Sequence, residues 1–598
     1  MCGIVALFAY GTSAPPVDPA ELRQLCDRMA ARGPDGSGEW LSPDGRVAMG
    51  HRRLSIIDLR AVADQPMAYG DGRLRIVFNG EIYNYKELRR QLAEEGHVFR
   101  TESDTEVLLH LYDRYGQDMV RHLRGMYAFA LWDEARGGLL LARDPFGIKP
   151  LYVADNGQTL RVASQVKSLV AGGRVDTSPE PAGHVGFFLW GNVPDPFTLF
   201  RGIRAVPAGT AMWLDRQRSH PPRPFFDLAE IFNGAPPAPA DPRARAELLR
   251  DALIDSVRHH LIADVPVGVF LSAGLDSTTI TALASESGAG NLNTVTLGFR
   301  EFQGGANDET ELAEAVARKY GTHHQTRWVL GHDFVAERER LFAAMDQPSI
   351  DGVNTYFVAK AARETGLKVA LSGLGGDELF GGYPSFRQIP RLVKALSPFA
   401  VVQWPGRIVR AATAGWLGAL TSPKYAGLLE YGPTWGGAYL LRRSLFMPWE
   451  LPDLLPYPMV RAGLEKLQTS DELHATVARI ENPRLKVSAL ELSWYMRHQL
   501  LRDSDWAGMA HSLEIRVPFV DIELVRRLAP LLASAAPPGK RDMADTPREK
   551  LPEPVLNRAK TGFVVPVRDW LLGEDRKAGD RGLRGWAKRV YDAHKAAA

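Results

Sequence analysis

A proline-rich, poorly periodic stretch divides this chain of 598 residues into two parts with different strand and helix patterns. It contains His220-Pro221-Pro222-Arg223-Pro224 and Gly234-Ala235-Pro236-Pro237-Ala238-Pro239. Proline has no backbone N–H and a fixed φ, so such a stretch continues neither a helix nor a central strand. We therefore predict two domains, residues 1–215 and 246–598, joined by a linker over residues 216–245.

The first part is dense in strands. An apolar run over residues 2–8 predicts a buried strand, and residues 74–78 predict another that ends in a sharp Asn79-Gly80 turn. Residues 126–132 and 139–142 have the pattern of a hairpin. Short strands in this order favour stacked sheets or an α+β fold.

The second part alternates strands and helices. Strands are predicted over residues 265–271, 292–299 and 368–371, and helices over 277–287 and 308–320. This order favours a doubly wound α/β fold, a parallel sheet with helices on both faces. Residues 384–500 are mostly helical by pattern, so we expect helices added to that sheet.

The composition excludes several classes of protein. Hydrophobic residues make up 45% of the chain and charged residues 24%, which rules out a wholly disordered chain. The net charge of +2 gives no reason to expect nucleic acid or an acidic membrane as a partner. The only cysteines, Cys2 and Cys26, exclude a disulfide-dense scaffold. With so few cysteines, we expect a cytoplasmic chain. We expect neither a signal peptide nor a membrane span, because the first residues lack a basic region and no apolar run approaches roughly 18 residues.

Cys2 is a candidate nucleophile. Removal of Met1 would leave this cysteine at the amino terminus, where its own α-amine, with a reference pKa near 7.7–8.0, can act as the adjacent base. The alternative is a small buried hydrophobic residue. The other polar residues of the first part favour the nucleophile.

The other polar residues of the first part have the chemical groups needed to bind an α-amino acid and react with it. An Asn79-Gly80 turn can direct an amide side chain and a backbone N–H at one point, as an oxyanion hole requires. Glu81 and Asp104 are suited to an ammonium group, and Arg53 can pair bidentately with a carboxylate. Each of these charges taken alone is more often solvated surface.

Together, the first-part segments resemble a known family. They are Cys2-Gly3-Ile4, Arg32-Gly33-Pro34-Asp35-Gly36, Arg53-Leu54-Ser55-Ile56, Phe78-Asn79-Gly80-Glu81-Ile82-Tyr83-Asn84, Ser103-Asp104-Thr105-Glu106 and Arg143-Asp144-Pro145-Phe146-Gly147. They resemble the N-terminal-nucleophile (Ntn hydrolase-like) glutaminase domain, in the order found in glutamine-hydrolysing asparagine synthetases. The resemblance implies an αββα sandwich with Cys2 as nucleophile and Asn79 with Gly80 as oxyanion hole.

The same resemblance assigns the glutamine-binding residues. It gives Arg53 to the α-carboxylate of glutamine, and Glu81 with Asp104 to its α-amine.

A second motif opens the other domain. The strand over residues 265–271 runs into Ser272-Ala273-Gly274-Leu275-Asp276-Ser277 and then a helix, an arrangement that brings backbone N–H groups and a helix N-terminus to an anion. It lacks the Gly-Lys-Ser/Thr of a Walker loop. It resembles the Ser-Gly-Gly-x-Asp-Ser pyrophosphate loop of ATP pyrophosphatases, with Ala273 in place of the first glycine. The resemblance makes Ser272, Gly274, Asp276 and Ser277 ATP-binding residues; the alternative is a tight strand–helix turn.

A third motif is the glycine-rich run from Leu371 to Tyr383. It lacks the spacing of a dinucleotide fingerprint. The resemblance supports ATP contacts from Ser372 and Gly373. It also supports a magnesium site made by Asp276 with Asp377, since carboxylate oxygens suit this hard cation. Further residues that it places in the site are Leu271 and Leu297, against the adenine or ribose, and Lys560, which would neutralise the leaving pyrophosphate.

The resemblance covers residues 2–570 and implies a two-site amidotransferase, a ligase that uses ATP and Mg²⁺. Glutamine would be hydrolysed to glutamate and ammonia. The β-carboxylate of aspartate would be adenylated with loss of pyrophosphate, and ammonia would reach it through an interior channel and form asparagine, releasing AMP. The segment 502–519 resembles the helix and loop that close the synthetase site. A homodimer is a further expectation from the family.

One residue departs from the family pattern. Leu374 stands where an acidic residue usually takes a proton from the attacking ammonia, and leucine cannot accept one. Either Glu378 or a phosphate oxygen serves instead, or the acceptor is another carboxylate, such as a sugar uronate or a natural-product acid. The segment 351–355 departs as well. β-Lactam-forming relatives with an inactive glutaminase domain are disfavoured by Cys2, and a non-catalytic binding protein would bind ligands without turnover.

Overall fold

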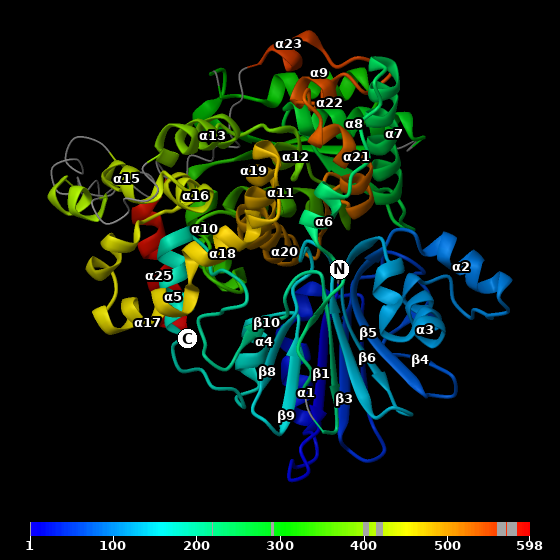
Figure 1. Cartoon of the computed structure of the whole chain (residues 1–598). Coiled ribbons are helices and arrows are strands. Elements are labelled where there is room, and N and C mark those ends of the chain that lie inside the picture. The colour runs from blue at the N-terminus through cyan, green and yellow to red at the C-terminus, as the bar shows by residue number, and fades with distance from the viewer. Residues whose placement is uncertain are drawn as a thin grey trace.

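The computed structural model describes residues 2–597 except 218, 289–291, 306, 399–405, 414–421, 559–569 and 571–582. Its two domains are stacked, with the strand-rich N-terminal domain in blue and cyan below the helix-rich C-terminal domain (Figure 1). Among the described helices, none is long and apolar enough to cross a membrane.

The N-terminal domain contains two antiparallel six-stranded sheets. The first has the strand order β10-β8-β9-β1-β3-β2, and the second β12-β11-β7-β6-β5-β4. The strands of the first sheet are β1 (Gly3–Ala9), β2 (Gly36–Leu41), β3 (Val47–Arg53), β8 (Tyr152–Asp155), β9 (Thr159–Ala163) and β10 (Arg204–Ala205). Those of the second are β4 (Met67–Tyr69), β5 (Leu74–Ile82), β6 (Gly125–Asp133), β7 (Gly138–Arg143), β11 (Thr210–Asp215) and β12 (Arg223–Pro224).

Strand β1 shows why the two sheets stack. Its alternate side chains point to opposite faces, and both faces are apolar. Ile4 and Phe8 join the cluster between the sheets together with Trp132. Val5 and Leu7 instead pack with the outer helices α1 (Pro19–Arg28) and α4 (Val166–Ala171). With α2 (Tyr85–Glu94) and α3 (Asp104–Tyr115) packed on the second sheet, the domain is the predicted αββα sandwich.

The predicted turn at Asn79-Gly80 is wrong. Strand β5 continues through both residues to Ile82, and they pair with Ala128 and Tyr127 of β6. The glycine is needed for close approach, because a Cβ at Gly80 would lie 2.1 Å from the Met126 carbonyl oxygen. A glycine that admits a neighbouring backbone has the same sequence signature as a turn.

The segment predicted as a linker contains regular structure. Strand β12 adds to the edge of the second sheet beside β11, and α6 (Leu228–Asn233) follows. Proline is tolerated in β12 because an edge strand pairs on one side only.

The C-terminal domain is built on a five-stranded parallel sheet with the order β15-β14-β13-β16-β17. Its strands are β13 (Val267–Phe270), β14 (Asn293–Phe299), β15 (His323–Val329), β16 (Val369–Leu371) and β17 (Glu514–Arg516). Helices α7 (Pro242–His260), α8 (Leu275–Glu286) and α21 (Ile522–Ala533) pack with Val269 in one hydrophobic cluster. Helices α10 (Gly331–Ala344), α11 (Val353–Glu364) and α20 (Arg502–Met509) pack with Val295 in another. The fold is therefore doubly wound, as predicted.

Further helices extend this domain, as the pattern over residues 384–500 predicts. Those used below are α9 (Thr310–Lys319), α12 (Gly376–Phe380), α16 (Trp435–Arg443) and α22 (Lys540–Ala544), with the π-helical segment η8 (Glu491–Leu501). From the N-terminal domain, α5 (Pro181–Trp190) packs against α17 (Tyr457–Leu467). Strand β17 has no counterpart among the sequence predictions, because three residues are too few for a periodic pattern.

Candidate active sites in the two domains

Cys2 lies at the start of β1, where the two sheets of the N-terminal domain meet. Its backbone nitrogen donates a hydrogen bond to Asn79 Oδ1 at 2.9 Å. That nitrogen is the α-amine if Met1 is removed, so Asn79 then holds the candidate base. Burial raises the pKa of the Cys2 thiol, which favours a neutral thiol that the α-amine deprotonates.

Asn79 and Gly80 belong to strand β5 and lie beside Cys2. Asn79 is fully buried, and its Nδ2 has no hydrogen-bond partner among the described residues. A buried amide donor without a partner is costly unless it binds something during function. The two residues predicted as an oxyanion hole thus lie next to the candidate nucleophile, on a strand that pairs with β6 rather than in a turn.

Glu81 and Asp104 are both buried near one another. Asp104 Oδ2 accepts a hydrogen bond from the Ile82 nitrogen at 3.0 Å, and burial raises the pKa of Asp104 to about 6. Burial and the nearby Glu514 carboxylate raise the pKa of Glu81 well above its usual value. Two buried carboxylates that repel each other are suited to bind a cation such as an ammonium group.

Arg53 is buried at the end of β3 and holds the loop that follows. One of its terminal nitrogens donates to Asp64 Oδ1 at 2.7 Å and to the Arg60 carbonyl oxygen at 3.1 Å. The other donates to the carbonyl oxygens of Ile57 and Asp58. Its role toward a substrate carboxylate stays a prediction.

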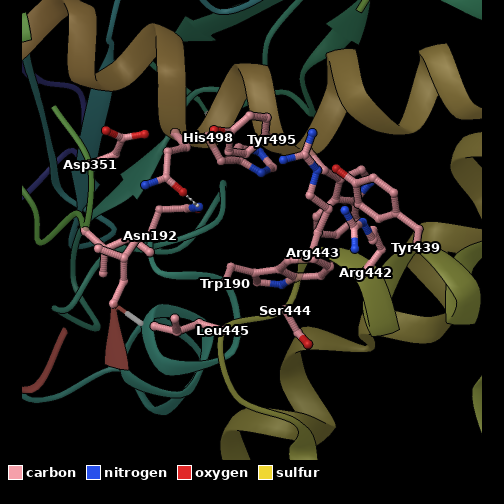
Figure 2. Close-up of a pocket in the computed structure, with 14 residues that line it drawn as sticks. Trp190, Asn192, Asp351, Tyr439, Arg442, Arg443, Ser444, Leu445, Tyr495 and His498 are labelled. Carbon is pink, nitrogen blue, oxygen red and sulfur yellow. Dashed lines mark hydrogen bonds between the residues drawn. The ribbon is translucent and has the colours of Figure 1, made fainter. Parts of the chain in front are cut away.

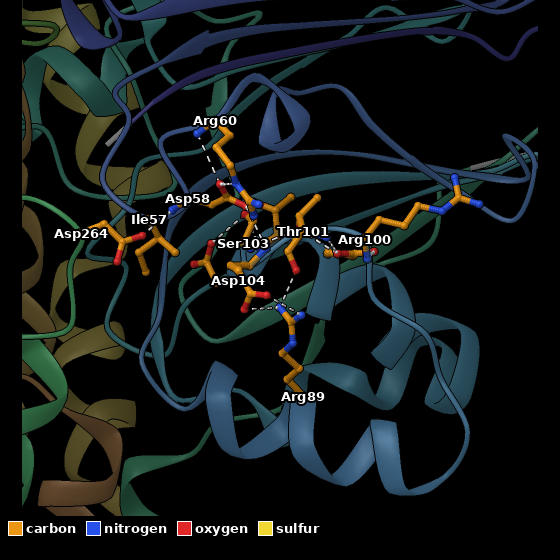
Figure 3. A network of polar contacts seen from close by, with 12 residues as sticks. Ile57, Asp58, Arg60, Arg89, Arg100, Thr101, Ser103, Asp104 and Asp264 are labelled. Atoms are coloured by element: carbon orange, nitrogen blue, oxygen red, sulfur yellow. Dashed lines mark hydrogen bonds and ion pairs between the residues drawn. The ribbon is translucent and has the colours of Figure 1, made fainter.

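Asp58 joins that loop to its surroundings (Figure 3). Its carboxylate accepts hydrogen bonds from the Glu102 nitrogen at 2.8 Å and from the Arg60 side chain at 2.7 Å. These bonds lower the pKa of Asp58 to about 2. Its own nitrogen donates to Asp264 Oδ2 at 2.8 Å. Because Asp264 precedes β13, the loop beside the candidate glutamine site is docked on the C-terminal domain.

The predicted phosphate loop connects β13 to α8. Ser277 Oγ lies 3.2 Å from the Ser272 nitrogen, 3.1 Å from Ser272 Oγ and 3.3 Å from the Gly274 carbonyl oxygen, so the loop is closed on itself. Ala273 adopts a left-handed conformation with φ of 51°. A glycine would take this conformation without strain. Ala273, which replaces the first glycine of the motif, therefore occupies a loop position where the left-handed backbone favours glycine.

The glycine-rich turn after β16 packs directly on this loop. A Cβ at Gly373 would lie 2.8 Å from Asp276 Cβ, and one at Gly376 would lie 2.4 Å from Asp276 Oδ1. The Ser372 nitrogen donates to the Arg516 carbonyl oxygen of β17 at 2.8 Å. The two motifs that are far apart in sequence therefore form one site at the carboxyl ends of adjacent parallel strands.

Asp276 and Asp377 face the same cation, the ammonium of Lys540 on α22. Lys540 Nζ lies 2.6 Å from Asp276 Oδ2 and 2.8 Å from Asp377 Oδ1. Burial lowers the pKa of Lys540, but the two carboxylates outweigh it and raise the pKa. Since both carboxylates already converge on one cation, their oxygens fit a magnesium ion as well. Lys540 is a residue that the sequence analysis did not find.

Three predicted residues of the ATP site remain: Leu271, Leu297 and Lys560. Leu271 and Leu297 are buried in hydrophobic clusters, Leu271 with residues of α8 and α9 and Leu297 with residues of α10 and α11. Their contact with a nucleotide stays a prediction. Lys560 lies outside the described residues.

Leu374 is partly buried and packs against a hydrophobic cluster instead of presenting an acid. Glu378, on α12 next to Asp377, is buried and accepts a hydrogen bond from the Tyr383 hydroxyl at 3.0 Å. Burial and the neighbouring Asp377 raise the pKa of Glu378 to about 7. Glu378 is thus a carboxyl that can exchange a proton near neutral pH.

A cavity of about 230 Å³ lies beyond Glu378, between α5, α16 and η8 (Figure 2). Burial first, and then the charges of Asp351 and Glu378, raise the pKa of Tyr495, so this lining residue lies near both carboxylates. Trp190 Nε1 and Asn192 Oδ1 are buried at the cavity without partners among the described residues. The cavity therefore offers an aromatic wall, an orphan donor and an orphan acceptor.

Two family models match the chain. One, described as a glutamine amidotransferase domain, matches residues 1–226, and the other, described as asparagine synthase, matches residues 248–594. The chain belongs to the glutamine-hydrolysing asparagine synthetase family. Cys2 and Asn79 lie in the first matched region of this family member, and Asp276 and Asp377 in the second.

Two named relatives match nearly the whole chain, and a third matches about two thirds of it. A Mycobacterium tuberculosis protein provisionally named a glutamine-hydrolysing asparagine synthetase is 35% identical, over 100% of this chain and 91% of its own. Glutamine-hydrolysing asparagine synthetase 1 of Bacillus subtilis is 34% identical, over 96% of this chain and 88% of its own. Asparagine synthetase B of Escherichia coli is 33% identical, over 65% of this chain and 66% of its own.

The structure adds buried interdomain charges that the sequence analysis left unassigned. Arg32 Nε donates to the Cys2 carbonyl oxygen at 3.0 Å, and its other two nitrogens bind the Asp505 carboxylate of α20 at 2.7 and 3.0 Å. Arg516 of β17 lies 3.3 Å from Glu81. Both arginines belong to segments that resemble the family, but only their burial (1% and 0% exposed) separates them from surface charges.

Proposed function

We propose that this chain hydrolyses glutamine in its N-terminal domain and uses the ammonia to amidate a carboxylate in its C-terminal domain, with the β-carboxylate of aspartate as acceptor. The Cys2 thiol, deprotonated by the α-amine that Asn79 holds, attacks the glutamine amide carbon. Asn79 Nδ2 and the Gly80 N–H stabilise the oxyanion of the tetrahedral intermediate. Ammonia leaves, a thioester remains, and water releases glutamate.

Charged residues of the first site bind the two charged groups of glutamine. Glu81 and Asp104 bind its α-ammonium group. Arg53 binds its α-carboxylate, which replaces some of the hydrogen bonds that Arg53 makes to the loop containing Asp64.

In the second site, ATP lies across the Ser272–Ser277 loop and the Ser372–Gly373 turn. Asp276 and Asp377 would hold the magnesium ion, which neutralises phosphate charge when bound. The acceptor carboxylate attacks the α-phosphorus, pyrophosphate leaves, and an acyl-adenylate forms. Ammonia attacks that carbonyl, AMP leaves, and Glu378 takes up the proton because Leu374 cannot.

One observation carries the proposal: the Cys2 nitrogen is bonded to Asn79 Oδ1, and the buried Nδ2 of the same amide has no partner among the described residues. A single amide thus holds the candidate base and presents a donor for the oxyanion. A purely structural asparagine would satisfy both ends.

The test is pyrophosphate release with glutamine, MgATP and aspartate, beside an aspartate-free control and mass detection of asparagine. We expect aspartate-dependent pyrophosphate with equal asparagine and glutamate. Binding of glutamine and ATP without any turnover would contradict the proposal and favour a non-catalytic protein.

A second candidate keeps the chemistry and changes the acceptor to a larger carboxylic acid. The cavity beyond Glu378 favours it, because an aromatic wall with an orphan donor and acceptor suits a hydroxylated ring. Glutamate formation without asparagine, together with pyrophosphate release that depends on a uronic acid, would support this candidate.

A further inference from the structure

Strand β17 lies between the two candidate sites. It is an edge strand of the parallel sheet, pairs with β16 alone among the described strands, and is buried at all three residues. Its last residue, Arg516, has its carbonyl oxygen bonded to the Ser372 nitrogen of the predicted ATP site at 2.8 Å. Its side chain extends to Glu81 of the predicted glutamine site. One residue therefore contacts both sites, through its backbone on one side and its guanidinium on the other.

The guanidinium of Arg516 is anchored to the C-terminal domain. Its Nε donates to Glu514 Oε1 at 2.7 Å, and one terminal nitrogen donates to the carbonyl oxygens of His260 and Ile262 at 2.9 and 2.6 Å. The side chain is therefore held to β17 by Glu514 and to the end of α7 by the two carbonyl oxygens. A shift of β17 together with the end of α7 carries the guanidinium with it.

The contact with Glu81 is looser than these anchors. The other terminal nitrogen of Arg516 lies 3.3 Å from Glu81 Oε2, and neither atom has a hydrogen-bond partner of good geometry among the residues that the structure describes. Around them, Glu514 and Asp104 add two more buried carboxylates. Arg516 is thus a cation in the cluster of acids that would receive the α-ammonium of glutamine, and the two cations compete for Glu81.

We propose that Arg516 is a positioning residue that links glutamine affinity to occupancy of the ATP site. The inference rests on the proposed function. A nucleotide bound at Ser372 holds β17 in its own sheet, which keeps the guanidinium back from Glu81 and leaves that carboxylate to the substrate ammonium. ATP binding then strengthens glutamine binding, and glutamine strengthens ATP binding by the same factor.

The test measures glutamate formation by the full chain over a range of glutamine concentrations, with and without the magnesium complex of an ATP analogue that has an uncleavable α,β bond. For the wild type, we expect the analogue to lower the KM for glutamine about fivefold while kcat stays nearly constant. In Arg516→Gln, the KM no longer depends on the analogue. Arg516→Lys, which keeps a cation near Glu81, recovers part of the dependence.

A matched control is Arg502→Gln. Arg502 also joins the domains, through Asp195, and its side chain is only 9% exposed, but it is not bonded to Glu81 or Ser372 in this structure. We expect this variant to keep the dependence of KM on the analogue. If Arg516→Gln fails to fold, Glu514→Gln takes the charge from the anchor of the Arg516 Nε, which weakens it, and is expected to reduce the dependence instead.

The inference would be overturned if the wild-type KM for glutamine were the same with and without the analogue. It would also be overturned if the KM of Arg516→Gln depended on the analogue as strongly as that of the wild type. Two further activities separate this failure from that of the proposed function. Glutamate formation without nucleotide tests the first site, and ammonium-dependent pyrophosphate release tests the second. If both are present without coupling, only the role of Arg516 is wrong.

Discussion

The two candidate sites of this family member are held in place by different kinds of structure. In the N-terminal domain, Cys2, Asn79 and Glu81 lie on or beside paired strands, and their positions follow from sheet register. In the C-terminal domain, the Ser272–Ser277 loop and the Ser372–Gly373 turn follow strand ends and are held by side chains and by Lys540. Sheet pairing therefore fixes the residues of the first site. In the second site, side-chain contacts and the ion pairs of Lys540 hold the residues, and a bound substrate can replace those contacts.

The sharpest test of this contrast is Cys2→Ala. We expect glutamine-dependent product formation to fall at least about 10³-fold, because the nucleophile is lost. Ammonium-dependent formation should stay within about twofold of wild type, since the second site contains its own chemistry. The measurement is pyrophosphate release with each nitrogen donor, and retained glutamine use would contradict the assignment of Cys2.

Asp377→Asn tests the second site in the same way. Loss of one of the two carboxylates that face Lys540 leaves less charge to hold a divalent cation. We expect pyrophosphate release to fall about 10²–10³-fold. Glutamate formation should remain, and its parallel loss would show that the sites are not organised separately.

Asn79→Ala tests the claim that the first site depends on the fold. Removing the amide takes away a donor for the oxyanion and the partner of the Cys2 nitrogen. We expect kcat for glutamate formation to fall about 10²-fold, as for other oxyanion-hole donors. A change confined to KM would mean that the amide binds substrate instead.

The pH dependence sharpens the electrostatic side of the comparison. The pKa of Asp104 is raised to about 6, so its carboxylate is charged above pH 6 and neutral below it. A neutral Asp104 binds ammonium weakly, so kcat/KM for glutamine should fall about tenfold between pH 7 and pH 5. In Asp104→Asn the profile should lose this step, and a step that persists would assign it to another group.

The smallest expected effect is that of Ala273→Gly. Ala273 has φ of 51° in the phosphate loop, a conformation that costs an alanine about 1–2 kcal/mol. Glycine removes this cost but loses more chain entropy on folding, so we expect a gain in stability of at most about 1 kcal/mol. Urea unfolding measures it, and a clear loss would show that the methyl group makes a contact worth more than the strain.

Much of the fold could be predicted from the sequence because its signals are local. The apolar run of residues 2–8 and the hairpin around residues 133–138 became β1 and the β6–β7 pair. The strand–loop–helix around Gly274 is likewise confirmed as β13 and α8. These features depend on side-chain periodicity and turn residues within about 20 positions.

The misassigned features depend on distant neighbours. Asn79-Gly80 has the sequence of a turn, yet the backbone of β6 approaches Gly80 and keeps it within a strand. Strand β17 is too short for a periodic signal and forms only because β16 offers an edge. Lys540 lies 264 positions from Asp276, and nothing in its local sequence indicates that pairing.

The sequence by itself determined the chemical groups: a cysteine next to the amino terminus, an asparagine, two acids, and two glycine-rich loops with aspartates. Only the tertiary structure decided which of these groups meet. Arg32 with Asp505 and Arg516 with Glu81 are separated by hundreds of residues and joined across the domain interface. The physical reason is that charge pairing acts over a few ångströms of space whatever the chain separation.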